Sequence, residues 1–228
     1  AGMLIINAYV GMIFNAMATD YFPRLSAINK DNNAIQKGVN EQAEIAILLI
    51  TPIITLFLLF KELIIQILYT PSFLVITGIV TFGILGTLFK AVSFSLGYVI
   101  IAKGHSKVYI KTAIVFNILM LLISVGSYKY GGLDGLGLGL LIYYFIHFLG
   151  IKWINAHLYK LRLSKHTLYL LLISCVICIS VYMALQIKGT FLRYCITSLL
   201  VLVSVVFTIM QLQKRVDFKA LIKRGFKK

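Results

Sequence analysis

Long apolar stretches alternate with short polar segments along this chain. The apolar stretches cover roughly residues 3–22, 43–69, 73–102, 108–128, 132–158, 167–187 and 191–213. A helix needs about 20 apolar residues to cross the hydrocarbon core of a bilayer, so each stretch is long enough. Strands of a membrane barrel would instead alternate over about ten residues, and lipid tolerates no unpaired backbone groups. The pattern therefore predicts an all-α, polytopic membrane helix bundle with about seven transmembrane helices.

Basic residues are distributed unevenly between the two sides of these stretches. Of the 22 Lys and Arg residues, 17 lie in segments that strict alternation places on one side of the membrane. The other side receives only Lys61, Lys129, Lys188 and Arg193, and Lys90 lies inside a stretch. Because Lys and Arg are retained in cytoplasmic loops, the count predicts a cytoplasmic C-terminus and an external residue 1.

The net charge and the hydrophobic content together indicate which partners to expect. A net charge of +15 would suggest nucleic acid in a soluble protein, but with 60% hydrophobic residues the basic excess fits anionic lipid. Residues 214–228, basic with interleaved apolar positions, predict an amphipathic helix on the cytoplasmic membrane surface. No carboxylates face each other at depth, and the histidines show no metal-ligand spacing. The sequence predicts neither an enzyme nor a cofactor, and no nucleic-acid partner.

Lys90 is the most informative polar residue, because a lysine at mid-span costs about 2.5 to 3.5 kcal/mol on insertion scales. Gly83, Gly86, Ser93 and Gly97 share its helical face at spacings of three and four. Such a stripe either packs closely against another helix or lines a watery cavity. We favour the cavity; the alternative is a lysine held by a backbone carbonyl or a carboxylate.

The first stretch also has a polar face, which carries Asn7 and Asn15. Away from their ends, the last two stretches hold only Ser, Thr and Cys as polar residues, so they are predicted to be peripheral, and the cavity is assigned to the first five. His147, one turn from Tyr143 and Tyr144, is interpreted as a hydrogen-bonded packing histidine rather than a ligand.

Several short motifs resemble bacterial polysaccharide flippases of the O-antigen translocase type. They occur in this order: DYFPRLSAI (20–28), NEQAEIA (40–46), TPI (51–53), LYTPSF (68–73), LGTLFKAVS (85–93), AKG (102–104) and GGLDGLG (131–137). Each motif is short, but their order and spacing are hard to obtain by chance. The resemblance covers about residues 1–158.

The resemblance implies membership of a superfamily that includes multidrug exporters and peptidoglycan precursor flippases, in which two six-helix lobes surround a cavity. Residues 1–158 would be five transmembrane helices of the C-terminal lobe, residues 159–213 two peripheral transmembrane helices, and residues 214–228 a basic cytoplasmic tail. The chain is then expected to be a C-terminal fragment, whose partner is the N-terminal lobe of the same protein.

The implied function is flipping of an undecaprenyl-pyrophosphate-linked saccharide across the bacterial inner membrane. Lys90 would attract the pyrophosphate beside Ser93, and Asn7 and Asn15 would bind sugars or water. Arg24 and Lys103 would gather the headgroup at the cytoplasmic entry. Two alternatives stay open. A multidrug-type cation exporter should carry a carboxylate deep in its cavity, and a non-transporting membrane scaffold would not need the Lys90 stripe.

Overall fold

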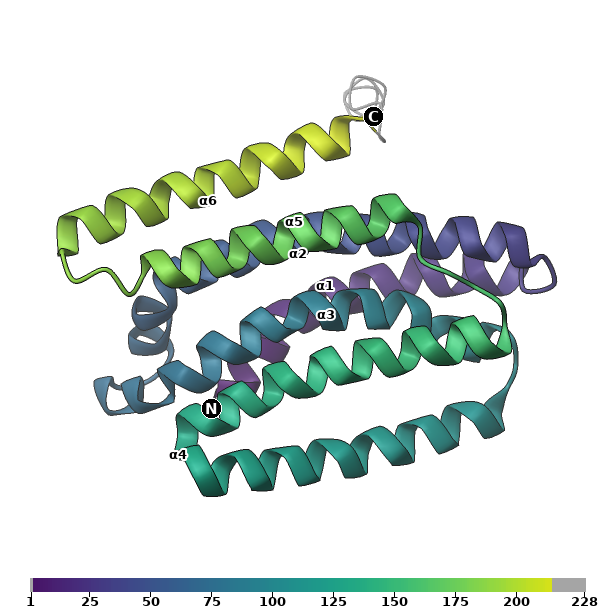
Figure 1. Ribbon diagram of the computed structural model, residues 1–228, viewed down its shortest axis with the longest axis horizontal. Coiled ribbons are helices and arrows are strands. Elements are labelled where there is room, and N and C mark those ends of the chain that lie inside the picture. The colour runs from purple at the N-terminus through teal and green to yellow at the C-terminus, as the bar shows by residue number, and fades with distance from the viewer. Residues whose placement is uncertain (1, 215–228) are drawn as a thin grey trace.

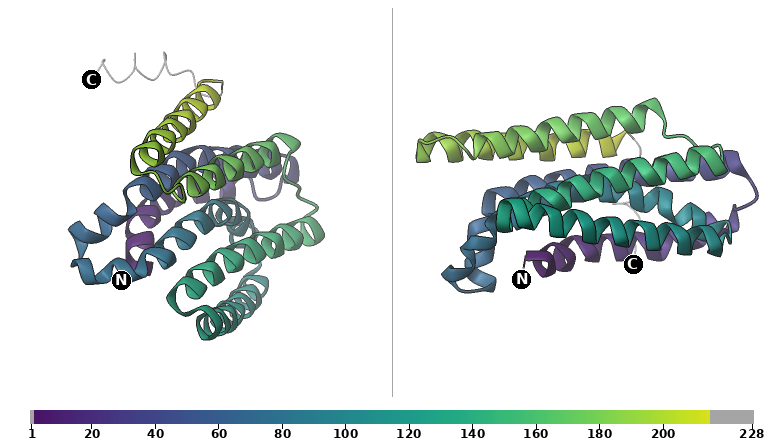
Figure 2. Two further views of the ribbon diagram at one scale, coloured as in Figure 1. Left: turned by 60° about the vertical axis from the view of Figure 1, so that its left-hand side comes forward. Right: turned by 60° about the horizontal axis from the view of Figure 1, so that its bottom comes forward.

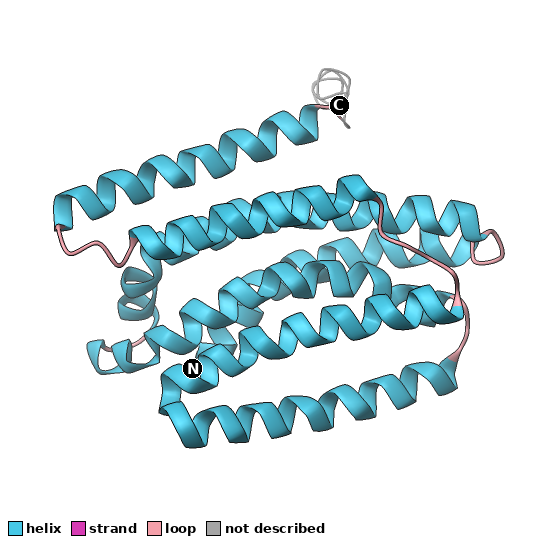
Figure 3. Ribbon diagram, in the orientation of Figure 1, coloured by secondary structure: helices cyan, strands magenta, loops and turns pink. Residues whose placement is uncertain are grey.

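The fold is entirely helical throughout the described part of the chain, which is residues 2–214 without the side chains of residues 3, 5–10 and 13. In this computed structural model the elements are α1 (Gly2–Ala27), α2 (Asn32–Leu68), the 3₁₀ helix η1 (Pro71–Ile76), α3 (Thr77–Ala102), α4 (Ser106–Leu158), α5 (Lys165–Ala184) and α6 (Thr190–Gln213). Figure 3 shows short loops between them. The predicted all-α class is confirmed, and the predicted tail helix lies outside the described residues.

The helices have the length and composition of membrane spans. Five described segments qualify: Asn32–Leu68, Pro71–Ala102, Ser106–Leu158, Lys165–Ala184 and Thr190–Gln213. The longest, α4, is bent at Gly132, whose φ of 57° and ψ of −140° are far from helical values. A positive φ is readily adopted by glycine. The bend folds α4 into a hairpin (Figure 1), and its two halves correspond to the predicted stretches 108–128 and 132–158.

Most of residues 23–42, the segment between the first two apolar stretches, is helical. α1 continues to Ala27, and α2 already begins at Asn32. The cause is Asp31, whose side chain accepts hydrogen bonds from the backbone N–H groups of Asn33 and Ala34 and so caps the helix. The polar residues before the second apolar stretch are therefore an extension of α2 beyond the apolar core.

The centre of the bundle is formed by α2 and α3. α1 and α4 pack on α3, whereas α5 and α6 pack on α2. Figures 1 and 2 show α6 at one side of the bundle and the α4 hairpin at the other. The core is apolar, and its fully buried side chains include Ile47, Leu58, Ile84 and Leu96.

The loops 28–31, 103–105 and 159–164 meet at one end of the bundle, which we call the cluster end (Figure 1). Lys103 Nζ donates to the carbonyl of Asn29 at 2.6 Å and to Asn32 Oδ1 at 2.7 Å. Asn32 in turn donates to the carbonyl of Tyr159 at 3.2 Å. His105 Nδ1 lies 2.9 Å from the Tyr159 hydroxyl. Burial raises the pKa of Tyr159, which keeps this hydroxyl protonated. The three loops, predicted to share one side of the membrane, are thus bonded to one another.

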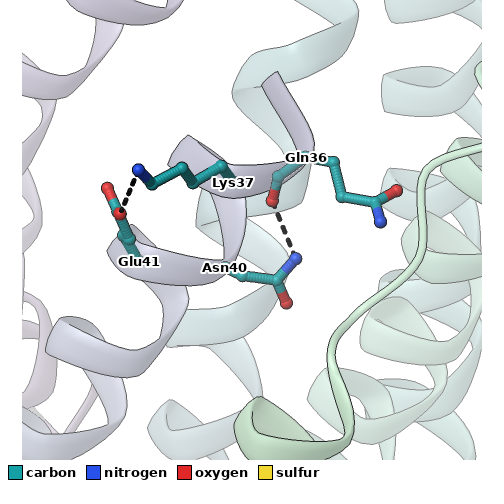
Figure 4. Close-up of polar contacts among 4 residues, drawn as sticks. All are labelled: Gln36, Lys37, Asn40 and Glu41. Carbon is teal, nitrogen blue, oxygen red and sulfur yellow. Dashed lines mark hydrogen bonds and ion pairs between the residues drawn. The ribbon is translucent and has the colours of Figure 1, made fainter. Parts of the chain in front are cut away.

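Beside this cluster, the first turns of α2 carry a polar surface (Figure 4). Asn40 Nδ2 donates to the carbonyl of Gln36 at 2.7 Å, and Lys37 lies 4.0 Å from Glu41 as an exposed pair one turn apart. Such an exposed pair contributes only about 0.3 to 0.5 kcal/mol. The buried member of this surface, Asn40, is the one that connects α2 to the rest of the molecule.

A buried polar network joins α2 to the start of α5. The Thr167 hydroxyl lies 2.8 Å from Asn40 Oδ1 and 2.6 Å from Glu44 Oε1, and it can donate its single proton to either acceptor. The Ser164 side chain caps α5 by accepting from the Thr167 N–H, and the Ser164 N–H donates to Asn40 Oδ1 at 2.6 Å. This network fixes the point at which α5 starts on the surface of α2.

Candidate functional site

Lys90 lies at the middle of α3, about 18 to 20 Å from either end of the helix at 1.5 Å per residue. Its side chain is half-buried. The ammonium nitrogen lies 5.5 Å from the ring centroids of both Phe14 on α1 and Tyr144 on α4. At this distance each ring face attracts the cation. α3 therefore presents a positive charge at mid-depth between two aromatic rings.

No carboxylate neutralises this charge within the described part of the chain. Lys90 has neither an ion pair nor a hydrogen bond to any described residue. The ion pairs of that part, Arg24 with Asp20 and Lys37 with Glu41, lie at the cluster end. The alternative interpretation, a lysine held by a carbonyl or a carboxylate, thus gains no support from the described contacts.

Lys90 opens into a groove of about 470 Å³ between α3 and both halves of α4, here called the Lys90 groove. The lining residues are mainly aromatic or small: Lys90, Ser93, Phe94, Gly97, Tyr98, Ile100, Ile101, Tyr109, Thr112, Ala113, Phe116, Asn117, Met120, Tyr143, Tyr144, His147 and Ile151. None of these lining residues is acidic. The groove is therefore a partly open, mostly apolar space with one cation at its inner end.

Glycines determine where this groove begins. A Cβ on Gly86 would lie 2.6 Å from Tyr144 Cδ2, and one on Gly137 would lie 2.6 Å from the carbonyl oxygen of Gly78. α3 and the second half of α4 thus touch closely there. A Cβ on Gly97 would meet no atom within 4 Å. The small-residue stripe of α3 packs tightly against α4 at Gly86 and lines the groove from Lys90 onward. Close helix packing and lining of a cavity, the two roles considered for this stripe, therefore both occur, in different parts of α3.

The groove offers hydroxyl groups that have no partner among the described residues. The Ser93 Oγ is buried and accepts or donates no hydrogen bond. The hydroxyls of Tyr143 and Tyr144 likewise make no hydrogen bond to described residues. Leaving the buried Ser93 hydroxyl without a partner costs about 1 to 3 kcal/mol. The two tyrosine hydroxyls are available to water or to a polar ligand in the groove.

The predicted site residues are only partly brought together. Ser93 and Lys90 line the same groove. Asn15 is exposed on α1 and is not a lining residue, and the side chain of Asn7 lies outside the described part. Arg24 is exposed and lies 2.8 Å from Asp20. Lys103 uses two of its three donors to hold the loops of the cluster end.

Sequence reasoning missed the contribution of the second half of α4. Tyr143, Tyr144, His147 and Ile151 follow spacings of three and four, which place them on one helical face. The His147 ring packs edge-on against Phe116 with the ring centroids 4.4 Å apart, as expected of a packing histidine. Its side chain makes no hydrogen bond to the described residues, and it also lines the groove. The spacing of these residues in the sequence predicts that they share one helical face. The sequence does not show that this face packs on α3.

No group of residues that could hold a metal ion occurs within the described part.

Known proteins are similar to this chain in part of its sequence and in its fold. Residues 2–78 match the model of a family described as polysaccharide biosynthesis protein. No curated protein matches the sequence of this chain. Among solved structures the chain is similar to one titled "Lipid II flippase MurJ, inward closed conformation", with a TM-score of 0.66 and 14% identity. The similarity covers 93% of this chain and 47% of that chain, so this chain spans about half the length of that structure.

The fold is thus a membrane helix bundle that is similar to about half the length of that solved structure. The resemblance that the motifs indicated is confirmed by two findings together: the match to the polysaccharide biosynthesis family and the similarity to the structure titled a lipid II flippase. The family match contains the motifs at 20–28, 40–46, 51–53 and 68–73. The motif around Lys90 lies beyond that match and within the structural similarity.

Proposed function

We propose that this chain forms one lobe of a transporter that flips a lipid-linked saccharide, and that it performs no catalysis. In the finer form of the proposal, the substrate is an undecaprenyl-pyrophosphate-linked repeat unit, which crosses the bacterial inner membrane for surface polysaccharide synthesis of the O-antigen type. The observation that carries the proposal is Lys90, a mid-span cation in a groove without acidic lining residues.

The chemistry of the groove suits an anionic, hydroxyl-rich headgroup. A pyrophosphate cannot cross hydrocarbon unaided, because unsolvated charge is very costly there. Lys90 supplies a point charge for the phosphate. The hydroxyls of Ser93 and the tyrosines supply hydrogen bonds for sugars or water, and the lipid tail stays in the bilayer beside the groove. A cation exporter would need the opposite charge at this position.

The groove needs a second wall to become a closed pathway. The most apolar window of α4 has no buried residues, and Ile114, Val115, Ile118 and Leu121 on its first half are each more than half exposed. This surface suits an N-terminal lobe of the same protein, because the similar structure has about twice the length of this chain. Transport would then proceed by rocking one lobe against the other around the Lys90 groove.

Charge distribution supports an orientation with the cluster end in the cytoplasm. The segments that carry 17 of the 22 basic residues include all three loops of that end. Arg24, at the end of α1, is then placed to attract the anionic headgroup before it enters.

The decisive experiment substitutes Lys90 in a cell whose surface glycan depends on this protein. Lys90→Gln should reduce glycan export about tenfold to hundredfold, because a hydrogen bond to a charged group is worth about 1.5 to 3 kcal/mol. Lys90→Arg should do less harm, since the charge survives. Surface glycan is measured by immunoblot, and protein level is measured in the same membranes.

Lys152→Gln is the matched control. Lys152 also lies over an aromatic ring, 5.9 Å from the centroid of Phe148, but it does not line the Lys90 groove. Its substitution should leave export unchanged. Normal glycan with Lys90→Leu at normal protein level would refute the proposal, and loss of the protein itself would show that Lys90 is structural.

A further inference from the structure

Two cations other than Lys90 lie close together at the end of the bundle opposite the cluster end. That end was predicted to hold only four basic residues between the spans. Two of these four, Lys61 on α2 and Arg193 in the first turn of α6, line one groove of about 350 Å³, here called the Arg193 groove. It shares no lining residue with the Lys90 groove.

The two cations are only partly satisfied by their surroundings. Lys61 Nζ donates to Thr81 Oγ1 at 3.0 Å. The Arg193 guanidinium lies 5.0 Å from the Tyr194 ring centroid, and its buried Nε has no hydrogen-bond partner within the described part. Glu62 also lines the groove but forms no ion pair with either cation at 4.0 Å or less. The groove therefore has a formal charge of +1 and at least one buried donor without an acceptor.

The rest of the groove is apolar and continuous with the membrane-facing surface. Leu58, Leu59, Phe60 and Leu63 line it from α2, and Phe60 and Leu63 are 45% and 51% exposed. α6 begins at Thr190, so the N–H groups of its first turn point toward the same end of the bundle. Free N–H groups at a helix N-terminus favour an anion.

We propose that the Arg193 groove binds the phosphate of an anionic membrane phospholipid. Arg193 and Lys61 would hold the phosphate oxygens, with the guanidinium supplying a geometry that matches phosphate. The acyl chains would lie along Phe60 and Leu63. The lipid would bridge α2 and α6 and so fasten the outermost helix to the bundle. The inference does not depend on the substrate proposed for Lys90.

The test measures lipid binding to the full chain in nanodiscs by native mass spectrometry, with phosphatidylglycerol and phosphatidylcholine as probes. The wild-type chain should retain phosphatidylglycerol about tenfold more strongly. The double variant Lys61→Gln/Arg193→Gln should lose this preference, because both charge-assisted bonds disappear. Lys188→Gln removes a cation of the same end that does not line the groove, so it should retain the preference. Equal retention by the wild type and the double variant would overturn the proposal.

Two further measurements distinguish a phospholipid from a soluble anion and cover a variant that does not fold. In the first, inorganic phosphate or pyrophosphate is added at increasing concentration. If either one displaces phosphatidylglycerol when present at the same concentration as the lipid, the groove binds a soluble anion and the proposed phospholipid is refuted. If the double variant fails to fold, a phosphatidylglycerol with a photoreactive headgroup is cross-linked to the wild-type chain. Cross-links within residues 58–63 and 193–198 support the site, and cross-links only elsewhere refute it.

Discussion

Gly137 offers the sharpest test of how α3 and α4 are held together. It lies on the second half of α4, where a Cβ would be 2.6 Å from the carbonyl oxygen of Gly78 and 2.8 Å from the Cα of Ile79. Both are backbone atoms of α3, so the contact cannot be relieved by rotation of a side chain. Ordinary contact begins at 3.4 Å, and Gly137→Ala must therefore separate the helices by about 0.8 Å.

The expected cost follows from a comparison with Gly126→Ala. Gly126 lies on the first half of the same hairpin, and a Cβ there would meet no atom within 4 Å. Both substitutions gain about 1 kcal/mol of helix propensity, so their difference isolates the packing at Gly137. Overpacking costs typically about 1 to 3 kcal/mol, and we expect Gly137→Ala to be less stable than Gly126→Ala by this amount.

The assay is thermal unfolding of the two purified variants in the same detergent. A difference of this size corresponds to about 2 to 12 °C for a chain of this length. Gly137→Ala should also impair export more than Gly126→Ala, because the close contact fixes the wall of the Lys90 groove. Equal midpoints for the two variants would refute the helix contact at Gly137.

Three further outcomes are expected. Thr167→Val should lower the free energy of unfolding by about 1.5 to 3 kcal/mol, because it removes the hydroxyl that donates to Glu44, and denaturant titration measures the loss. Reporter fusions after Lys228 should be cytoplasmic and those near Lys129 or Gly189 external; an external C-terminus would contradict the proposed orientation. The 228 residues alone should not restore surface glycan in a flippase-deficient cell, whereas co-expression with an N-terminal lobe should restore it. Restoration by the chain alone would mean that it assembles its own pathway.

The helices could be predicted from the sequence because a long apolar run that crosses lipid can form few structures other than a helix. The residues at which the helices begin and end could not be predicted as well. Asp31 starts α2 well before the apolar stretch, and this effect depends on a side chain capping the backbone rather than on hydropathy. Gly132, in contrast, was readable as a turn, because glycine-rich sequence separates two apolar stretches there.

Site residues could be predicted only where a single residue is unusual for its position in the sequence. Lys90 stands out because a charge inside an apolar run is costly, and Ser93 follows from its spacing. The residues of α1 and α4 that lie beside Lys90 depend on which helices pack against α3. Residue spacing within one helix does not reveal which helix it packs against. The polar face assigned to the first stretch shows the same limit: Asn15 is exposed, whereas its neighbour Phe14 lies beside Lys90.

The buried network between α2 and α5 imposes an order on biosynthesis. Thr167 is 127 residues later in the chain than Asn40. At about 5 to 20 residues per second, Asn40 is therefore synthesised about 6 to 25 s before Thr167. During this interval the amide nitrogen can bond to the Gln36 carbonyl of its own helix, whereas Asn40 Oδ1 lacks its donors Ser164 and Thr167 and is left to water. Its place in the first turns of α2, beside the loops, keeps it near the headgroup water until the arrival of α5 closes the network.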